Sequence, residues 1–384
     1  MGWSFRWILS WDEVFDPGNV ADWLVPFQPA SGAFASPFMH PDFARAWLAA
    51  VGGPDAFDPY FLQAASSDGR KALWLMVRPK PSWQQGYVRS LVPIGSPVPP
   101  HGHRSRLAAY YEPIFTRGPL DADEGAGFWG TLLDELEDMS GNDFDAFSIH
   151  RFRAGCVGSP RGAEPHTIAP YLRLSPYRDA DSYLRARKAR VRSAIRRRLR
   201  NLSAAGRVEL KVHRPDEVED VIAWLPRMQA ERTRRYGAQA PAGGFLPRMV
   251  RLGLGGRLVH ASTLLLDGRQ ISWMFGYLLQ GTYYGYYRAF DPAFERFSPG
   301  VVHFFHLVEW MFDNGVHTVD FGIDAHPYKA EWTDGEAWEI RSLQLKSRAA
   351  SSLARRSAAA TIRRTTKLVE RVHLGAISAF LLAN

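Results

Sequence analysis

Residues 68–74 read Asp-Gly-Arg-Lys-Ala-Leu-Trp, and residues 267–273 read Asp-Gly-Arg-Gln-Ile-Ser-Trp. In both copies the Trp stands at the same offset from Asp-Gly, and the flanking residues are apolar and alternating. Asp-Gly supplies the positive φ that a tight hairpin turn needs. The repeat therefore predicts two β-hairpins, which pair residues 60–65 with 73–77 and residues 261–266 with 271–278.

The same three elements follow each hairpin: a third strand, an amphipathic helix that opens on glycine, and a short strand after a turn of one polar residue and glycine. They are predicted at 87–94, 127–139 and 144–150 in the first copy, and at 283–290, 300–312 and 317–321 in the second. Two β-β-β-α-β units indicate a duplicated α+β fold. Each half is expected to be a mixed, mostly antiparallel sheet flanked by helices.

The positive charge is confined to two blocks. The 384-residue chain carries a net +8 with pI ≈ 9.6. Residues 182–214 hold twelve basic side chains and one acidic one, and residues 341–384 hold nine and one, which leaves a net −11 for the remainder. The first block is predicted to be an amphipathic helix at 182–202, because its apolar side chains recur at helical spacing. These are Leu184, Val191, Ile195, Leu199 and Leu202.

Two interpretations of this arginine-rich helix remain open. It is either a solvated cationic face over a packed apolar stripe, or an anion site for the phosphates of a cofactor, a nucleic acid or a lipid head group. A second helix is predicted at 218–235. The Gly/Pro-rich loop at 236–244 that follows it is a candidate lid on the substrate side.

Cysteine usage favours the cytoplasm. With Cys156 alone, no internal disulfide and no zinc site of several thiolates can form. The first residues lack the apolar core of a secretion signal, and the longest apolar stretches fall short of the ~20 residues of a membrane-spanning helix. No metal is expected either, because the pairs His303/His306 and His101/His103 lack an obvious carboxylate or thiolate to complete a site.

The stretch from about Tyr171 to Trp332 resembles the GNAT acyltransferase core, in the FemAB-like or BioF2-like branch associated with bacterial polysaccharide and cell-envelope biosynthesis. The resemblance is carried by the arginine-rich helix, the second Asp-Gly-Arg hairpin, and four further motifs in a fixed order: residues 283–291 (Tyr-Tyr-Gly-Tyr-Tyr-Arg-Ala-Phe-Asp), Ser298-Pro299-Gly300, Asp320-Phe321-Gly322 and Tyr328-Lys329-Ala330-Glu331-Trp332. It implies tandem GNAT-like (acyl-CoA N-acyltransferase) halves. We expect a degenerate half at 1–165, the acyltransferase domain at 166–345, and a basic tail at 346–384.

The donor site is expected where Ser298-Pro299-Gly300 begins a helix, since the first helical amides lack intrahelical partners and the helix dipole favours anions there. Four amides are predicted to point outward, those of residues 300–303. The resemblance implies coenzyme A phosphates at this terminus and no permanently bound cofactor, with acetyl-CoA or another acyl-CoA as co-substrate. The expected donor-binding residues are Arg296, Ser298, Gly300, Val301 and Val302. The same residues also fit a plain helix start, with Ser298 as cap and Pro299 in the first position.

Acyl transfer by direct attack needs a group that takes the proton of the nucleophile and a donor to the leaving group. The resemblance implies Tyr328 as that donor, and Lys329 could stabilise developing negative charge. Asp320 and Asp291, at the ends of neighbouring strands, are candidate bases, with Asp324 as a third; each also fits a turn or cap. The alternating tyrosines of the third strand could line an acceptor groove, for which the candidates are Tyr284, Tyr286, Arg288 and Asp324.

Three function classes follow. The first is a cytoplasmic acyltransferase that moves an acyl group from acyl-CoA to an amine or hydroxyl of a small molecule, a glycan precursor or another envelope precursor. The second is a FemAB-type aminoacyltransferase that uses aminoacyl-tRNA, with the arginine-rich helix on RNA phosphates. The third is a non-catalytic binding protein. The tail at 346–384 is expected to be mobile, or to attach the protein to the anionic inner face of the membrane.

Overall fold

The computed structural model describes residues 2–28, 31–80, 88–97, 107–237, 244–254 and 258–361. Both predicted hairpins are present. β2 (Phe57–Ser66) pairs with β3 (Lys71–Pro79), and β9 (Val259–Leu266) pairs with β10 (Arg269–Leu279). These strands supply core residues to each half, but β3, β9 and β10 are buried over consecutive residues, hence on both faces, and not on alternate residues as the pattern predicted.

Each half contains a strand ahead of its predicted hairpin that the sequence did not reveal. β1 (Trp3–Ile8) pairs with β2, and β8 (Val208–Val212) pairs with β9. The remaining elements follow the predicted order. They are β4 (Ser90–Pro93), α4 (Ala122–Met139) and β6 (Ala146–Arg153) in the first half, and β11 (Thr282–Phe290), α10 (Pro299–Asp313) and β12 (Thr318–Asp320) in the second. In each half the last two strands run parallel.

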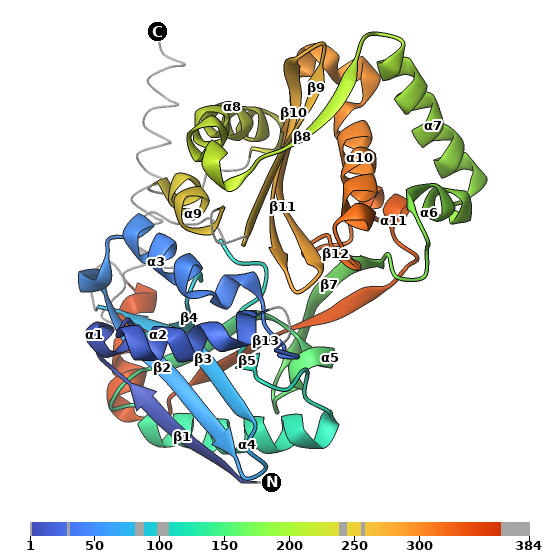
Figure 1. The fold of residues 1–384 in the computed structure, drawn as a ribbon. Coiled ribbons are helices and arrows are strands. Elements are labelled where there is room, and N and C mark those ends of the chain that lie inside the picture. Colours follow the sequence, from blue (N-terminus) through green and yellow to red (C-terminus); the bar gives the residue numbers. More distant parts are fainter. Residues whose placement is uncertain are drawn as a thin grey trace, which may run out of the picture.

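The two halves exchange their final strands. β7 (Glu164–Arg173) follows β6 in the chain but pairs with β12, whereas β13 (Ala337–Lys346) follows the second half but pairs with β6. β7 and β13 also pair with each other, which joins the halves into one sheet of order β1-β2-β3-β4-β6-β13-β7-β12-β11-β10-β9-β8, with the short β5 (Ile114–Phe115) beside β3. In Figure 1, β13 crosses from the upper half into the lower one.

Helices cover both halves. α1 (Trp11–Val14), α2 (Pro17–Leu24), α3 (Pro41–Ala50) and α5 (Ala154–Val157) belong to the first half, and α8 (Val218–Tyr236), α9 (Phe245–Gly253) and α11 (Pro327–Trp332) to the second. α3 packs against α9, with the rings of Phe43 and Phe245 5.4 Å apart, so the apolar core is continuous between the halves. None of the helices described is both long and apolar enough to cross a bilayer.

The arginine-rich segment forms two helices rather than the single helix predicted at 182–202. α6 (Ala180–Ala186) and α7 (Ala189–Ser203) are separated by Arg187, whose backbone is extended. The buried Arg187 side chain donates to the carbonyl of Trp332 and pairs with Asp334, which fixes the break. The predicted apolar stripe is real, because Ile195 and Leu202 are buried.

Two further boundaries differ from prediction. α4 begins at Ala122 and not at residue 127, because Asp121 and Glu124 form a reciprocal capping box there. Residues 350–361 are helical rather than a mobile tail. Ser352 and Arg355 both donate to the buried Asp145 carboxylate at the start of β6, which fastens this helix to the first half. Residues 362–384 and most of the candidate lid lie outside the described residues.

Candidate active site

The gap between β11 and β12 defines the candidate site. The two strands pair only over Thr282–Tyr284 and Thr318–Asp320, after which β12 ends while β11 continues to Phe290. β10 lines the other edge of β11 as far as Phe290. The later part of β11 therefore presents a strand edge to a gap, and two adjoining cavities lie along it.

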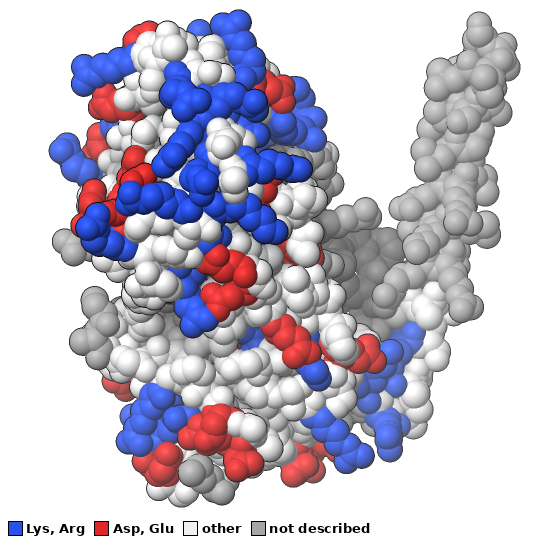
Figure 2. Space-filling view, turned by 90° about the vertical axis from the view of Figure 1, so that its right-hand side faces the viewer, with Lys and Arg blue, Asp and Glu red and all other residues white. Residues whose placement is uncertain are grey.

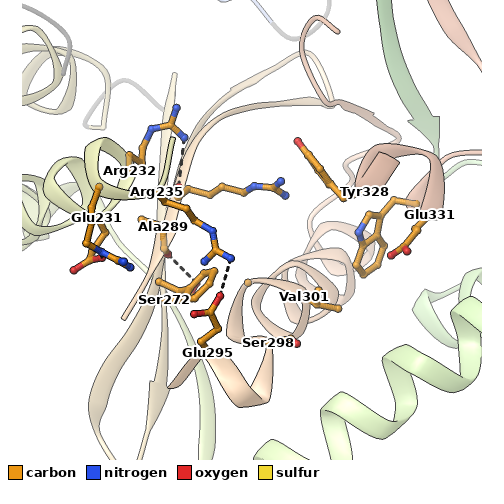
Figure 3. A pocket seen from close by; sticks show the side chains of 15 residues that line it. Glu231, Arg232, Arg235, Ser272, Ala289, Glu295, Ser298, Val301, Tyr328 and Glu331 are labelled. Carbon is orange, nitrogen blue, oxygen red and sulfur yellow. Dashed lines mark hydrogen bonds and ion pairs between the residues drawn. The ribbon is translucent and has the colours of Figure 1, made fainter. Parts of the chain in front are cut away.

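The first cavity, about 270 Å³, lies between α8, the end of β11, the start of α10, and α11 (Figure 3). Its polar lining comprises four arginines and three glutamates, namely Arg232, Arg234, Arg235, Arg288, Glu231, Glu295 and Glu331. Arg235 pairs with Glu295 at 2.8 Å, and Arg234 pairs with Glu231 at 2.9 Å. These contacts hold guanidinium groups around a space that an anion could enter.

The start of α10 borders this cavity, with Ser298, Gly300 and Val301 in the lining. Ser298 has positive φ (52°) and does not cap the helix with its side chain. The expectation of four outward amides was wrong, because the amides of Val301 and Val302 both donate to the Ser298 carbonyl, at 2.9 and 3.4 Å. Of the other expected donor residues, Val302 is buried in the core and Arg296 stacks on Phe297; neither lines the cavity.

A buried hydrogen-bond chain fixes α10 to the sheet. Ser272 donates to the carbonyl of Ala289, so its oxygen must accept from Nδ1 of His303, 3.0 Å away. The His303 proton is therefore on Nδ1, and Nε2 accepts from Ser262 at 3.0 Å. Burial lowers the pKa of His303 to about 3, so the ring is neutral. Because Ser272 also lines the first cavity, this chain sets the position of the helix start beside it.

The second cavity, about 300 Å³, is largely aromatic. Tyr283, Tyr286 and Tyr287 line it from β11, Phe304 from α10 and Phe321 from the loop after β12. It shares three residues with the first cavity, which are Arg232, Arg288 and Tyr328. The guanidinium of Arg288 lies 3.6 Å from the centre of the Tyr328 ring, so this stacked pair forms the partition between the two spaces.

Of the predicted site residues, Tyr328, Arg288 and Tyr286 all line the second cavity. The Tyr286 hydroxyl donates to the carbonyl of Leu107 in the first half. Tyr284 was also expected in the acceptor groove, but it is buried and lines neither cavity. Asp324 is exposed and accepts from Thr167 at 3.1 Å.

Asp320 and Asp291, the candidate bases, line neither cavity. Asp320 is 2% exposed; the Tyr110 hydroxyl donates to its two oxygens at 2.8 and 2.9 Å, and burial raises its pKa. Asp291 caps the turn that follows β11 and pairs with Arg227 and Arg269. Burial alone would raise the pKa of Asp291, but the Ala293 amide and these guanidinium groups hold it below its usual value.

Lys329 also points away from both cavities. Its Nζ donates to the carbonyls of Gly322 (3.0 Å) and Ile323, and burial lowers its pKa to about 8. The side chain therefore fastens the loop between β12 and α11.

Several lining residues were not predicted from the sequence, among them His326, Glu331, Arg232 and Arg235. His326 lines the second cavity, with its ring 5.0 Å from that of Tyr328. A signal for it exists, because His326-Pro327 directly precedes the Tyr328–Trp332 motif at the start of a helix. Arg232 and Arg235 are three residues apart on the predicted helix at 218–235, which places both on one face. Within the described parts of the chain, no group of three or more His, Cys, Asp or Glu side chains could hold a metal ion.

Comparison with known proteins agrees with this geometry. Residues 189–330 match a family model described as an acetyltransferase (GNAT) domain. The fold is GNAT-like, a mixed sheet flanked by helices, and the matched stretch lies in the second half. No curated protein matches.

Solved structures are similar to this chain at low sequence identity. FemX superposes with a TM-score of 0.52 at 10% identity, over 79% of this chain and 91% of that one. The C-terminal domain of a putative lysylphosphatidylglycerol synthetase from Agrobacterium fabrum gives 0.50 at 12% identity, over 88% and 94%. A tandem GNAT protein from the clavulanic acid biosynthesis pathway gives 0.44 at 12% identity, over 89% and 98%.

Proposed function

We propose that this protein is a cytoplasmic acyltransferase of the FemAB-like or BioF2-like kind, which moves an acyl group from acyl-CoA to an amine or hydroxyl of a cell-envelope or polysaccharide precursor. The observation that carries the proposal is the gap between β11 and β12, with a cationic cavity at one end and an aromatic cavity beside it. A long donor with an anionic end and an uncharged arm fits this arrangement, with the anionic end in the first cavity and the arm leading to the second.

The phosphates of the donor occupy the first cavity. They lie at the start of α10, where the helix dipole is positive, beside Arg235 and Arg288. The pantetheine arm then follows the open edge of β11, where its amides pair with the backbone as an added strand would. From Phe290 to Gly285 this edge is about 16 Å long at ~3.3 Å per residue, which brings the thioester to the second cavity.

The chemistry takes place beside Tyr328. The nitrogen or oxygen of the acceptor attacks the thioester carbonyl carbon, the C–S bond breaks, and the acyl group is transferred without a covalent enzyme intermediate. His326 takes the proton of the acceptor, and Tyr328 gives its hydroxyl proton to the leaving thiolate. The Arg288 guanidinium against the Tyr328 ring stabilises the tyrosinate that forms.

Substitution at these two positions tests the assignment. Tyr328→Phe and His326→Gln should each lower kcat by about 100-fold, the usual contribution of a general acid or base. Two conservative controls lie outside the cavities: Tyr171→Phe on β7, where the ring stacks on Trp338, and His306→Gln, whose partner is Glu309. Turnover of acetyl-CoA with an amine acceptor should be normal in both controls. Equal rates in Tyr328→Phe and Tyr171→Phe would contradict the role of Tyr328.

A second candidate donor, aminoacyl-tRNA, is favoured by the surface of α7. Arg185 and Arg196 pair with Asp181, but Arg190, Arg197, Arg198 and Arg200 have no carboxylate partner among the described residues. α7 packs along α10 and contacts the turn at Pro292–Phe297 beside the first cavity. Figure 2 shows these basic side chains gathered on one face. A polyanionic donor that extends out of the cavity would meet this surface.

Binding measurements separate the candidates. An acyl-CoA enzyme binds coenzyme A in calorimetry, and charge reversal on α7 (Arg197→Glu with Arg200→Glu) leaves this unchanged. An aminoacyl-tRNA enzyme instead binds tRNA with a steep salt dependence that the same substitutions reduce, whereas Lys71→Glu on the first half does not. Binding of neither donor would favour the non-catalytic class.

A further inference from the structure

One contact of the first half with the candidate active site is a hydrogen bond from Tyr110. Tyr110 lies in the loop before β5, is fully buried, and donates to the carboxylate of Asp320, which ends β12 in the second half. The guanidinium of Arg153, from β6, lies 4.5 Å from the centre of the Tyr110 ring and is itself paired with Glu112. Asp320 therefore meets a rigid, fully buried part of the other half.

Asp320 in turn holds the loop that leads through His326 into α11, where Tyr328 lies. Its Oδ1 accepts from the amide of Gly322 at 2.7 Å, and Gly322 has positive φ (69°). The carbonyl of the same Gly322 accepts from Nζ of Lys329 at 3.0 Å. The loop is thus fastened near its start by Asp320 and at its end by Lys329, the neighbour of Tyr328. His326 lies on the same loop, three residues before Lys329.

We propose that Tyr110 is a positioning residue for the segment that carries His326, at the end of the loop, and Tyr328, in the first turn of α11, so that the first half sets the geometry of a site built on the second. The order of contacts is Tyr110 to Asp320, Asp320 to Gly322, and Gly322 to Lys329. Tyr110 touches neither cavity, so it acts on the site through the loop alone. Its effect on turnover rests on the proposed function, whereas its effect on the loop does not.

The chain offers a matched control in the next residue. Tyr111 is also fully buried, but its hydroxyl donates to the carbonyl of Gly95 at 3.2 Å, and Arg151 donates to it at 3.1 Å, both within the first half. Tyr110→Phe and Tyr111→Phe each remove one buried hydroxyl of the same size. Tyr110→Phe removes the hydrogen bond to Asp320 of the second half, whereas Tyr111→Phe removes the hydrogen bonds with Gly95 and Arg151 of the first half.

Hydrogen exchange of the full-length protein is the first readout. In Tyr110→Phe the amides of residues 321–329 should exchange about tenfold faster, as expected for loss of one buried hydrogen bond to a charged group. In Tyr111→Phe they should exchange as in the wild type, with circular dichroism confirming the fold of both variants. Unchanged exchange of this segment in Tyr110→Phe, or equal acceleration in both variants, would overturn the inference.

Kinetics is the second readout. Tyr110→Phe should lower kcat about tenfold with KM for the donor changed less than about twofold, because the donor cavity is intact while the loop is not. Asp320→Asn keeps Oδ1, which accepts from both the Tyr110 hydroxyl and the Gly322 amide, and should retain most of kcat. If the wild-type protein had no transferase activity, the proposed function would be wrong, and hydrogen exchange alone would then test the role of Tyr110. If the wild-type protein is active and Tyr110→Phe has a normal kcat, the proposed effect of Tyr110 on turnover is wrong.

Discussion

At the scale of single residues, the structure separates groups that the sequence places side by side. Tyr328 and Lys329 are adjacent in the chain, but Tyr328 faces both cavities whereas Lys329 binds loop carbonyls. Asp320 ends the predicted strand as expected, yet its carboxylate is turned into the junction between the halves. The sequence pattern predicts a polar residue at the end of this strand. The direction of the Asp320 side chain, however, depends on Tyr110, which lies 210 residues earlier, and a local sequence pattern cannot predict so distant a partner.

His303 gives a prediction on stability against pH. Its pKa is about 3 in the folded protein because of burial, and about 6.5 in the unfolded chain. Between these values the unfolded state binds more protons, so stability rises with pH, is complete above about pH 6.5, and is lost as pH falls towards 3. At pH 5 this one residue costs about 2 kcal/mol of the free energy of unfolding relative to pH 7.

Urea unfolding at pH 5 and pH 7 measures this cost. His303→Asn should be less stable than the wild type at pH 7 but should lose less stability between the two pH values. The control is His306→Asn, on the exposed side of the same helix. An unchanged pH dependence in His303→Asn would show that this ring is not the group that titrates.

At the scale of elements, the same Asp-Gly-Arg sequence makes two different turns. In the second half Leu266 pairs directly with Arg269, and Asp267 and Gly268 both have positive φ, so the loop has two residues. In the first half the pairing ends at Ala65 and Lys71, and only Gly69 of the turn has positive φ. The hairpins were predictable because Asp-Gly and the alternation are local, whereas the loop length also depends on contacts around each hairpin, such as Arg117 donating to the Asp68 carbonyl.

Two paired glycines on neighbouring strands give an element-scale prediction. Gly276 on β10 is the register partner of Gly285 on β11. A Cβ on Gly276 would lie 2.6 Å from the carbonyl oxygen of Tyr284, so Gly276→Val should destabilise the protein by about 3 kcal/mol. A Cβ on Gly285 meets nothing closer than 3.5 Å and points to the second cavity.

Gly285→Val should therefore keep a melting temperature close to that of the wild type but weaken coenzyme A binding at least tenfold, about 1.4 kcal/mol, because the added methyl groups block the gap beside β11. Thermal melting and calorimetry of the two variants measure both effects. Wild-type affinity in a folded Gly285→Val protein would place the donor elsewhere.

At the scale of the whole molecule, duplication was readable from the sequence but strand exchange was not. Each half repeats its own local patterns, which report hairpins and helices. β13 has the same apolar pattern whether it pairs within its own half or with β6 of the other, so only the three-dimensional packing decides between these pairings. The same limit applies to β1 and β8. They are edge strands, and they are identified as strands only through their pairing with β2 and β9.

Strand exchange predicts that the halves unfold together. Ile340 on β13 is fully buried and pairs with Arg153 on β6 and with Thr167 on β7. Ile340→Ala should lower the free energy of unfolding by about 3 kcal/mol in a single transition. Hydrogen exchange should show the amides of β3 and β10 losing protection at the same denaturant concentration. Loss of protection in β10 before β3 would contradict this cooperativity.

The halves also differ in the charge at their equivalent helices. α4 begins with Asp121, Asp123 and Glu124, and the Asp121 side chain already accepts from an amide of the first turn, whereas the first turn of α10 has no acidic residue. An anionic donor is repelled at the first helix and attracted at the second. We therefore expect one donor site in a chain that contains two similar halves.

Calorimetric titration of the full-length protein with acetyl-CoA tests whether the chain has a single donor site. We expect one binding site per chain, with affinity reduced at least tenfold in Gly285→Val and unchanged in the surface control Lys71→Glu. No binding, or two equivalent sites per chain, would contradict it.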